Sequence, residues 1–145
     1  MNEAIMEAKK ALELDEVPVG AIIVKDGEII SRAHNLKEKN NDATAHAEIL
    51  AIRKASENLK AWRLRDCEMY VSLEPCPMCA GAIAQSRIKK IYIGTFDENL
   101  GACGSVINIL QNSHLNTFTE IKWVYSEECS SLLQNFFKSK RNKRK

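Results

Sequence analysis

The chain has 145 residues, of which 45% are hydrophobic and 28% charged, and its formal net charge is +2, which is ordinary for a soluble globular protein. At this length it can bury a core without disulfide bonds, and no stretch approaches the roughly 20 apolar residues that a membrane-spanning helix needs. The N-terminal segment also lacks the apolar run of a signal peptide. We therefore expect one cytoplasmic domain, residues 1–145, without a membrane partner.

The first part of the chain predicts a surface helix followed by a β-hairpin. Apolar residues recur at helical spacing from Ile5 to Leu12, and Pro18 then stops the helix. Two short runs rich in β-branched residues follow, 21–25 (AIIVK) and 28–32 (EIISR). They flank an Asp-Gly pair, which is a strong hairpin signal, so we predict two antiparallel strands.

Helices and strands alternate in the middle of the chain. Apolar residues occur nearly all round a predicted helix from about residue 45 to 57, so we expect it to be buried. A strand over 68–73 follows, and the segment Pro75-Cys76-Pro77 ends it and opens a second, nearly all-apolar helix over 78–85. The next strand is predicted over 90–94.

A weaker strand over 120–125 and a final helix complete the pattern. Strands that alternate with helices of ten or more residues are typical of α/β layered folds. We expect a mixed five-stranded sheet flanked by helices, with the third and fourth strands parallel and the hairpin antiparallel. The final helix has an apolar stripe that consists of Cys129, Leu132, Leu133, Phe136 and Phe137.

The C-terminal segment, residues 138–145, is strongly basic. It contains six lysine and arginine residues and no acidic residue, which leaves 15 basic and 19 acidic residues in the rest of the chain. Such a segment can be a solvated, frayed end. It can also contact nucleic acid, because clusters of lysine and arginine bind phosphates irrespective of sequence. The composition leaves both interpretations open.

The cysteine pattern points to a metal site. Five cysteines are an odd number, which argues against a disulfide framework in a chain without an export signal. Only Cys76 and Cys79 are closely spaced, and Pro77 suits the first position of a helix, whose dipole would favour thiolates at its N-terminus. With one histidine the pair makes three ligands, and catalytic zinc sites use three protein ligands and keep the fourth position for water.

His46 is the candidate third ligand, and Glu48 follows it by two residues. Side chains two apart on a regular helix point about 200° away from each other, by the 3.6-residue period. They converge only at a helix entry, so we predict that Thr44 is the N-cap and that both side chains occupy the first turn. Glu48 could then move protons for a water activated by the metal.

Each half of this pattern is ambiguous by itself. A His-x-Glu at a helix start can be a solvated cap, and Cys-x-x-Cys can be a thioredoxin-type redox pair, although that pair would follow the first strand of a βαβ unit rather than the third. The combination is far more specific. His-x-Glu followed by Pro-Cys-x-x-Cys, here with 29 residues between His46 and Cys76, is the established signature of zinc nucleobase deaminases.

Longer segments carry a narrower resemblance. The chain resembles the bacterial tRNA-specific adenosine deaminases, which convert the wobble adenosine of an anticodon to inosine, in EVPVGAIIV (16–24), ATAHAEILAIR (43–53), SLEPCPMCAGAIAQSRI (72–88) and YIGTFDENLGACGS (92–105). The likeness extends over essentially the whole chain. It implies a cytidine deaminase-like three-layer α/β fold, one zinc ion per chain and a tRNA anticodon stem-loop as the partner.

The resemblance also implies a role for each residue of the signature. His46, Cys76 and Cys79 would bind zinc, and Glu48 would carry protons from the zinc-activated water to the purine ring and the leaving ammonia. The water would attack C6 of adenine.

Three further residues match substrate contacts of the family. Asn35 matches a residue that hydrogen-bonds the flipped base, or is a turn residue. Asp97 matches a position near the ribose of the target, or is a loop acid. Phe137 matches an aromatic that touches the anticodon loop. Because Phe136 and Phe137 both fall on the apolar stripe, we predict that Phe136 is core and Phe137 lies at its edge.

The resemblance implies a homodimer as well. Cys103, Leu110 and the helix over 78–85 are candidates for its buried face. One departure from the family is Ala43, which stands where many relatives carry proline and touches no ligand.

We expect a zinc hydrolase that deaminates adenosine in a tRNA anticodon loop. Two alternatives stay open, namely a zinc deaminase of a free base or nucleoside such as guanine, cytosine or cytidine, and a non-catalytic zinc-stabilised RNA-binding module. The basic segment and Phe137 favour a polynucleotide over a free base. Glu48 argues against a purely structural zinc site, which would not require a carboxylate.

Overall fold

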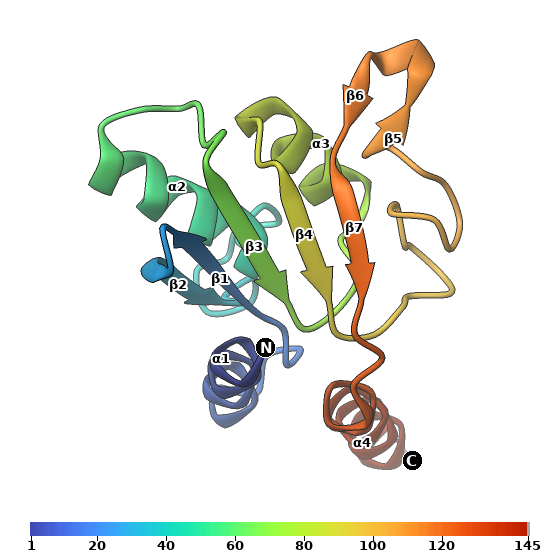
Figure 1. Ribbon diagram of the computed structural model, residues 1–145. Helices are drawn as coiled ribbons and strands as arrows, with labels where there is room; N and C mark the ends of the chain where they lie inside the picture. Colours follow the sequence, from blue (N-terminus) through green and yellow to red (C-terminus); the bar gives the residue numbers. More distant parts are fainter. Residues whose placement is uncertain (145) are drawn as a thin grey trace.

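A five-stranded sheet with strand order β2-β1-β3-β4-β7 forms the centre of the computed structural model, which describes residues 1–144 (Figure 1). β1 (Gly20–Lys25) pairs antiparallel with β2 (Glu28–His34) and with β3 (Cys67–Val71). β4 (Lys90–Ile93) is parallel to β3 on one side and to β7 (Glu120–Trp123) on the other. The predicted mixed sheet, with its antiparallel hairpin and parallel third and fourth strands, is confirmed.

The turn of the hairpin has the backbone that its sequence favours. Asp26 and Gly27 both have positive φ, 50° and 78°. A two-residue turn of type I′ needs positive φ at both central positions, and aspartate and glycine adopt it at low cost. The local sequence therefore fixes the connection between β1 and β2.

Two helices cover one face of the sheet, the rear face in Figure 1. They are α2 (Ala47–Leu59) and α3 (Pro77–Ser86). Small side chains such as Ala51 and Ala80 let both helices pack closely on strand residues such as Met69. The prediction that α2 is buried all round is wrong, because only one side of it faces the sheet and its charged residues after the first turn are exposed.

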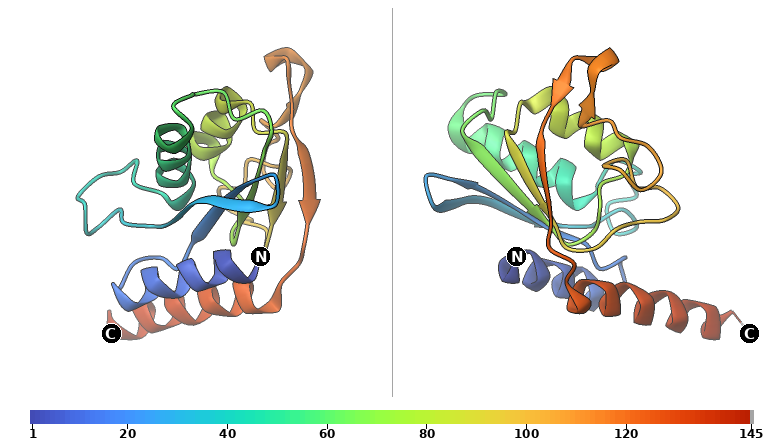
Figure 2. Two further views of the ribbon diagram at one scale, coloured as in Figure 1. Left: turned by 60° about the vertical axis from the view of Figure 1, so that its left-hand side comes forward. Right: turned by 45° about the vertical axis from the view of Figure 1, so that its right-hand side comes forward.

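The other two helices, α1 (Asn2–Glu13) and α4 (Glu127–Lys143), lie side by side beneath the opposite side of the sheet (Figures 1 and 2). Two glycines of the sheet region let these helices approach it closely. A Cβ at Gly20 would lie 2.1 Å from a backbone oxygen of α1, and a Cβ at Gly94 would lie 2.5 Å from Sγ of Cys129 in α4. Within residues 1–144 no helix has both the length and the apolar character needed to cross a membrane.

The basic C-terminal segment is helical as far as Lys143, and Lys145 lies outside the described residues. The ammonium group of Lys140 donates a 2.6 Å hydrogen bond to the carboxylate of Asp15, just after α1, and lies 5.4 Å from the ring centroid of Phe136. The described part of this segment therefore continues α4 as a helix up to Lys143.

The region between β4 and α4 departs most from the predictions. The strand predicted over 120–125 ends at Trp123, because Tyr125 adopts a φ of 55°, which is outside the extended region. A small hairpin of β5 (Gln111–Asn112) and β6 (Thr117–Phe118) encloses a short 3₁₀ helix, Ser113–Leu115. Two-residue strands are too short for an alternating pattern, so the sequence does not predict them.

The candidates for a dimer face need correction in the same region. Cys103 and Leu110 are 2% and 0% exposed within this single chain, where both belong to the hydrophobic core. A side chain that is already buried cannot lie in a contact with a second copy. The prediction is wrong for these two residues, because burial in the core and burial in an interface produce the same apolar signal.

Candidate active site

His46 and Cys76 are the N-cap residues of α2 and α3. Both have an extended backbone, with φ −78° and ψ 153° at His46 and φ −72° and ψ 174° at Cys76. Pro77 occupies the first position of α3, as predicted. The prediction of Thr44 as the N-cap of α2 is wrong, because the Thr44 hydroxyl donates a 2.7 Å hydrogen bond to the side chain of Asp42 in the preceding turn. Both helices present their N-termini to the same space.

Three potential metal ligands meet there. Nδ1 of His46 lies 3.7 Å from Sγ of Cys76 and 3.5 Å from Sγ of Cys79, and the ligand atoms all lie within 4.8 Å of one another. No fourth histidine, cysteine, aspartate or glutamate within residues 1–144 joins this group. Two sulfurs and one imidazole suit zinc, and a set of three leaves a position for water. The residues present therefore fit a catalytic zinc ion.

The protonation of the two thiols differs. The pKa of Cys76 is lowered to about 4, chiefly because the Cys79 thiol hydrogen-bonds to it and also because His46 lies beside it. The pKa of Cys79 is raised, because it is the donor toward Cys76 and because it is buried. The pKa of His46 is raised by its hydrogen bond to Cys76. A thiolate is thus already favoured at Cys76, and the thiolate is the form that binds metal.

Glu48 lies in the first turn of α2 and is only 4% exposed. Burial raises its pKa to about 7, because removing a carboxylate from water disfavours its charged form. A group with a pKa near 7 can accept a proton in one step and donate it in the next. We predicted that His46 and Glu48 both occupy the first turn; instead His46 is the N-cap and only Glu48 lies in that turn, but both side chains line one cavity.

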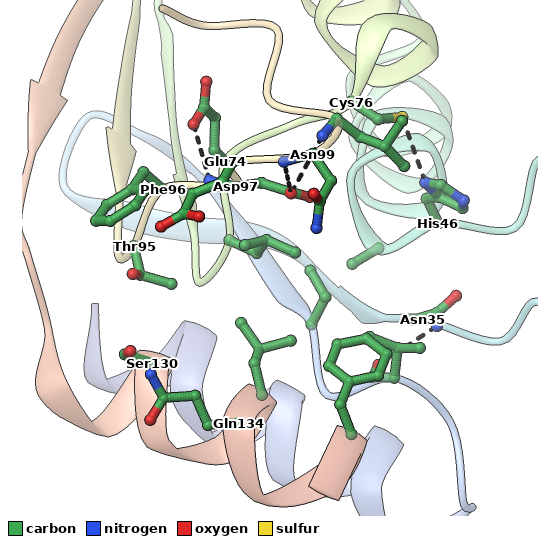
Figure 3. Close-up of a pocket in the computed structure, with 18 of the residues that line it drawn as sticks. Asn35, His46, Glu74, Cys76, Thr95, Phe96, Asp97, Asn99, Ser130 and Gln134 are labelled. Carbon is green, nitrogen blue, oxygen red and sulfur yellow. Dashed lines mark hydrogen bonds between the residues drawn. The ribbon is translucent and has the colours of Figure 1, made fainter. Parts of the chain in front are cut away.

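The cavity has a volume of about 590 Å³, and Figure 3 shows many of the residues that line it. Its walls come from the end of β2 and the following loop, the N-termini of α2 and α3, the loop after β4, and α4. Cys79 is fully buried behind this surface. The predicted residues that line the cavity are Asn35, His46, Glu48, Cys76, Asp97 and Phe137.

Asn35 follows directly after β2 and is buried, with its amide at the cavity wall. Its Nδ2 group donates to the carbonyl of Val17 at 3.3 Å, and its Oδ1 accepts the N–H of Lys37 at 3.2 Å. The second bond is the local bond of a turn residue. The amide still has one N–H and one lone pair for a ligand, so both interpretations of Asn35 apply to the same side chain.

Asp97 lies in the loop after β4, opposite Asn35 across the cavity in Figure 3. Its Oδ1 accepts the backbone N–H groups of Asn99 and Leu100, at 2.9 and 3.2 Å, and so closes a turn. Within the described residues its Oδ2 accepts no hydrogen bond. One oxygen of this carboxylate thus shapes the loop, and the other is free for a ligand.

Phe136 and Phe137 differ in exposure as predicted. Phe136 is 7% exposed and belongs to the buried side of α4, whereas Phe137 is 44% exposed and lines the cavity. Their rings meet edge to face with centroids 5.4 Å apart. The buried ring of Phe136 therefore packs against the exposed ring of Phe137 that lines the cavity.

Lys37, Glu74 and Arg141 are among the residues of the cavity wall that sequence reasoning missed. Lys37 and Arg141 bring positive charge to it, from the loop after β2 and from α4, and Glu74 is a buried carboxylate next to Pro75. The basic segment gave a signal for Arg141 but could not show that it reaches the same cavity as Lys37. Glu74 stands two residues before Cys76, which is the signal that could have found it.

Comparison with known proteins agrees with this geometry. A protein family model described as MafB19-like deaminase matches residues 1–141. The chain belongs to this family. Among relatives of this MafB19-like deaminase, the tRNA-specific adenosine deaminase of Aquifex aeolicus (strain VF5) is 52% identical, over 98% of this chain and 94% of the relative. The tRNA-specific adenosine deaminase of Bacillus subtilis (strain 168) is 49% identical, over 100% of this chain and 91% of the relative.

A solved structure from a study of A-to-I editing by tRNA:A34 deaminases at the wobble position of transfer RNA matches this MafB19-like deaminase with a TM-score of 0.88. The two sequences are 40% identical, and the match covers 92% of this chain and 97% of the chain in that structure. The predicted cytidine deaminase-like α/β fold is confirmed.

Proposed function

We propose that this MafB19-like deaminase converts adenosine 34, the wobble adenosine of a tRNA anticodon, to inosine. The proposal is carried by one observation: the group of His46, Cys76 and Cys79 lies beside Glu48 at a cavity that is also lined by an aromatic and a basic side chain of α4. Relatives that match the whole chain and bear the name of this activity support the choice of substrate.

The residues of the cavity would divide the reaction between them. A zinc ion on the three ligands would supply an activated water, because zinc lowers the pKa of bound water to about 7. Glu48 would take a proton and deliver it to the purine ring and to the leaving ammonia, which requires a pKa near that of the medium. Its burial provides that pKa and keeps bulk water from competing for the proton.

Other cavity residues would hold an extruded nucleotide. The free N–H and lone pair of Asn35 suit the edge of a purine, and the free oxygen of Asp97 suits a ribose hydroxyl. Phe137 offers a ring face for a neighbouring base, and Lys37 and Arg141 offer positive charge for phosphates. Unpaired loop nucleotides are cheap to extrude, which favours an anticodon loop over a duplex.

Asn35→Ala is expected to lower kcat/KM on an anticodon stem-loop by about 10- to 100-fold, because a bound purine would lose a hydrogen bond in a buried site. Initial rates of inosine formation at several stem-loop concentrations measure this. The matched control is Asn40→Ala, an exposed asparagine in the same loop, which should keep the parent value. Equal kcat/KM for Asn35→Ala and the parent would remove Asn35 from the base-binding site.

The two adjacent phenylalanines should separate RNA binding from folding. Phe137→Ala should weaken stem-loop binding by about 1 to 3 kcal/mol with little change in Tm, because an exposed ring contributes through stacking. Phe136→Ala should lower the free energy of unfolding by about 3 to 5 kcal/mol, because it removes a buried ring. Fluorescence anisotropy and thermal unfolding measure the two effects. A large loss of Tm in Phe137→Ala, with binding intact, would make that ring a core residue.

A substrate panel tests the proposed function itself. The purified protein is incubated with an anticodon stem-loop carrying adenosine at position 34, and separately with free adenosine, cytidine, cytosine and guanine, and ammonia and inosine are measured. We expect product only from the stem-loop. Product only from a free base would establish the free-base alternative, and stem-loop binding without any product would establish the non-catalytic RNA-binding module.

We also propose a homodimer, a cytoplasmic location and action as one domain, as the sequence predicted. The exposed apolar side chains of Leu100, Val106 and Ile107 replace Cys103 and Leu110 as candidates for the dimer face, and the predicted helix over 78–85, which is α3, stays a candidate. Sedimentation velocity of the parent and of Ile107→Glu tests this part. A monomeric parent would contradict it.

A further inference from the structure

Glu74 is a buried carboxylate, 2% exposed, two residues before the metal-ligand candidate Cys76. Its two oxygens accept hydrogen bonds from a single loop. Oε1 accepts the backbone N–H of Asp97 at 3.0 Å and the hydroxyl of Ser105. Oε2 accepts the backbone N–H groups of Cys103 and Ser105, at 3.0 and 3.1 Å. Figure 3 shows the bond to Asp97.

The backbone on either side of this carboxylate holds the same loop. The N–H of Glu74 donates to the carbonyl of Thr95 at 2.8 Å, and the N–H of Ala102 donates to the carbonyl of Pro75 at 2.9 Å. Contact is so close at Gly101 that an added Cβ would lie 2.4 Å from the carboxyl group of Glu74. The loop over 95–105 is thus wrapped around one side chain.

This loop is one wall of the cavity. Phe96, Asp97, Asn99 and Leu100 all line it, and Asp97 is the carboxylate that would meet the substrate ribose. Glu74 therefore connects the wall that would hold the substrate with the chain segment that provides Cys76. Neither the proton transfers nor the metal ligation uses its carboxylate.

We propose that Glu74 is a positioning residue, which fixes Asp97 and the substrate wall at a set distance from the metal centre. The expected effect of Glu74 on KM rests on the proposed function, but its effect on the loop does not. The carboxylate acts through the backbone of the loop and touches no reacting atom.

Glu74→Gln is a sharp test, because the amide keeps the size of the side chain and provides only one acceptor oxygen. With its NH₂ group at the position of Oε2, it would face two backbone N–H donors. At the position of Oε1 it faces one such donor, Asp97, and the Ser105 hydroxyl, which can rotate and accept. The second orientation is favoured, so the substitution should release Asp97 in particular.

The experiment measures hydrogen–deuterium exchange of the zinc-loaded protein, its zinc content, and its kinetics on the anticodon stem-loop. In Glu74→Gln we expect at least about tenfold faster exchange in peptides that contain residues 97–105, unchanged zinc, and a KM about tenfold higher with kcat within twofold. The matched control is Glu7→Gln, an equally buried carboxylate at the α1–β2 contact. It should lower Tm without changing loop exchange or KM.

A double-mutant cycle separates positioning from general destabilisation. If Glu74 acts through Asp97, then Glu74→Gln should raise KM much less in an Asp97→Ala background than in the parent. Equal effects in both backgrounds, or loop exchange at the parent rate, would overturn the proposal. If Glu74→Gln does not fold, Gly101→Ala serves as the second variant, because its methyl group would press against the same carboxyl group. It must then show the same faster loop exchange and the same rise in KM. Exchange and KM equal to those of the parent would overturn the proposal.

The exchange data remain decisive if the parent proves inactive on the stem-loop. In that case the proposed function fails, while faster exchange confined to residues 97–105 would still support the role of Glu74 in holding the loop. If the parent is active but residues 97–105 of Glu74→Gln exchange at the parent rate, the proposed function stands and only the positioning role of Glu74 is rejected.

Discussion

Glu48→Ala is expected to retain one zinc ion per chain and to lower kcat on an anticodon stem-loop by about 10²- to 10⁴-fold, the usual contribution of a positioned general acid and base. The side chain is not among the three ligand candidates, but it lies in the first turn of α2, directly after the N-cap His46, and is buried at the cavity wall. Metal analysis and single-turnover inosine formation measure the two quantities.

Glu57→Ala provides the control, since Glu57 is an exposed glutamate on the same helix. It should match the parent in zinc content and in rate. If Glu48→Ala deaminates at the parent rate, another group carries the protons. If it loses zinc, Glu48 supports the metal site rather than the proton transfers.

Cys76→Ser should lower zinc affinity by more than about 100-fold, which is beyond the 10- to 100-fold loss typical when only a group behind a ligand is changed. Zinc ligation contributes to folding, so the variant should also unfold at a lower temperature than the zinc-loaded parent. Zinc per chain after dialysis against a weak chelator and thermal unfolding with and without zinc measure these effects.

Cys67→Ser is the matched substitution, because Cys67 is a buried cysteine in β3 outside the ligand group. The Tm of Cys67→Ser can be lower than that of the parent because a hydroxyl is buried, but the variant should hold one zinc ion. Equal zinc affinity for Cys76→Ser and the parent would exclude Cys76 as a ligand.

Short-range signals in the sequence predicted the parts of the fold that depend on them. The Asp26-Gly27 pair determines a turn by its own backbone preference, and Pro77 marks the first position of α3. The metal group was predictable for a similar reason. Cys76 and Cys79 are close in sequence, and together with His46 and Glu48 they complete a known signature.

Specific contacts that no sequence pattern reveals explain what could not be predicted. Threonine is a residue type common at N-caps, but the hydroxyl of Thr44 donates its hydrogen bond to Asp42, and the helix begins later, after His46. The four bonds to Glu74 come from residues 23 to 31 positions further along, and nothing near Glu74 indicates them. Arg141 reaches the cavity only because α4 lies under the sheet beside α1.

X-ray absorption at the zinc edge of the zinc-loaded protein tests the central claim most directly, namely that two sulfurs and one imidazole hold the ion and leave a position for water. The account predicts two sulfur scatterers at about 2.3 Å and two nitrogen or oxygen scatterers at about 2.0 to 2.1 Å. A shell of three or four sulfurs would require a further cysteine, such as Cys103, to close the site, and would contradict the account.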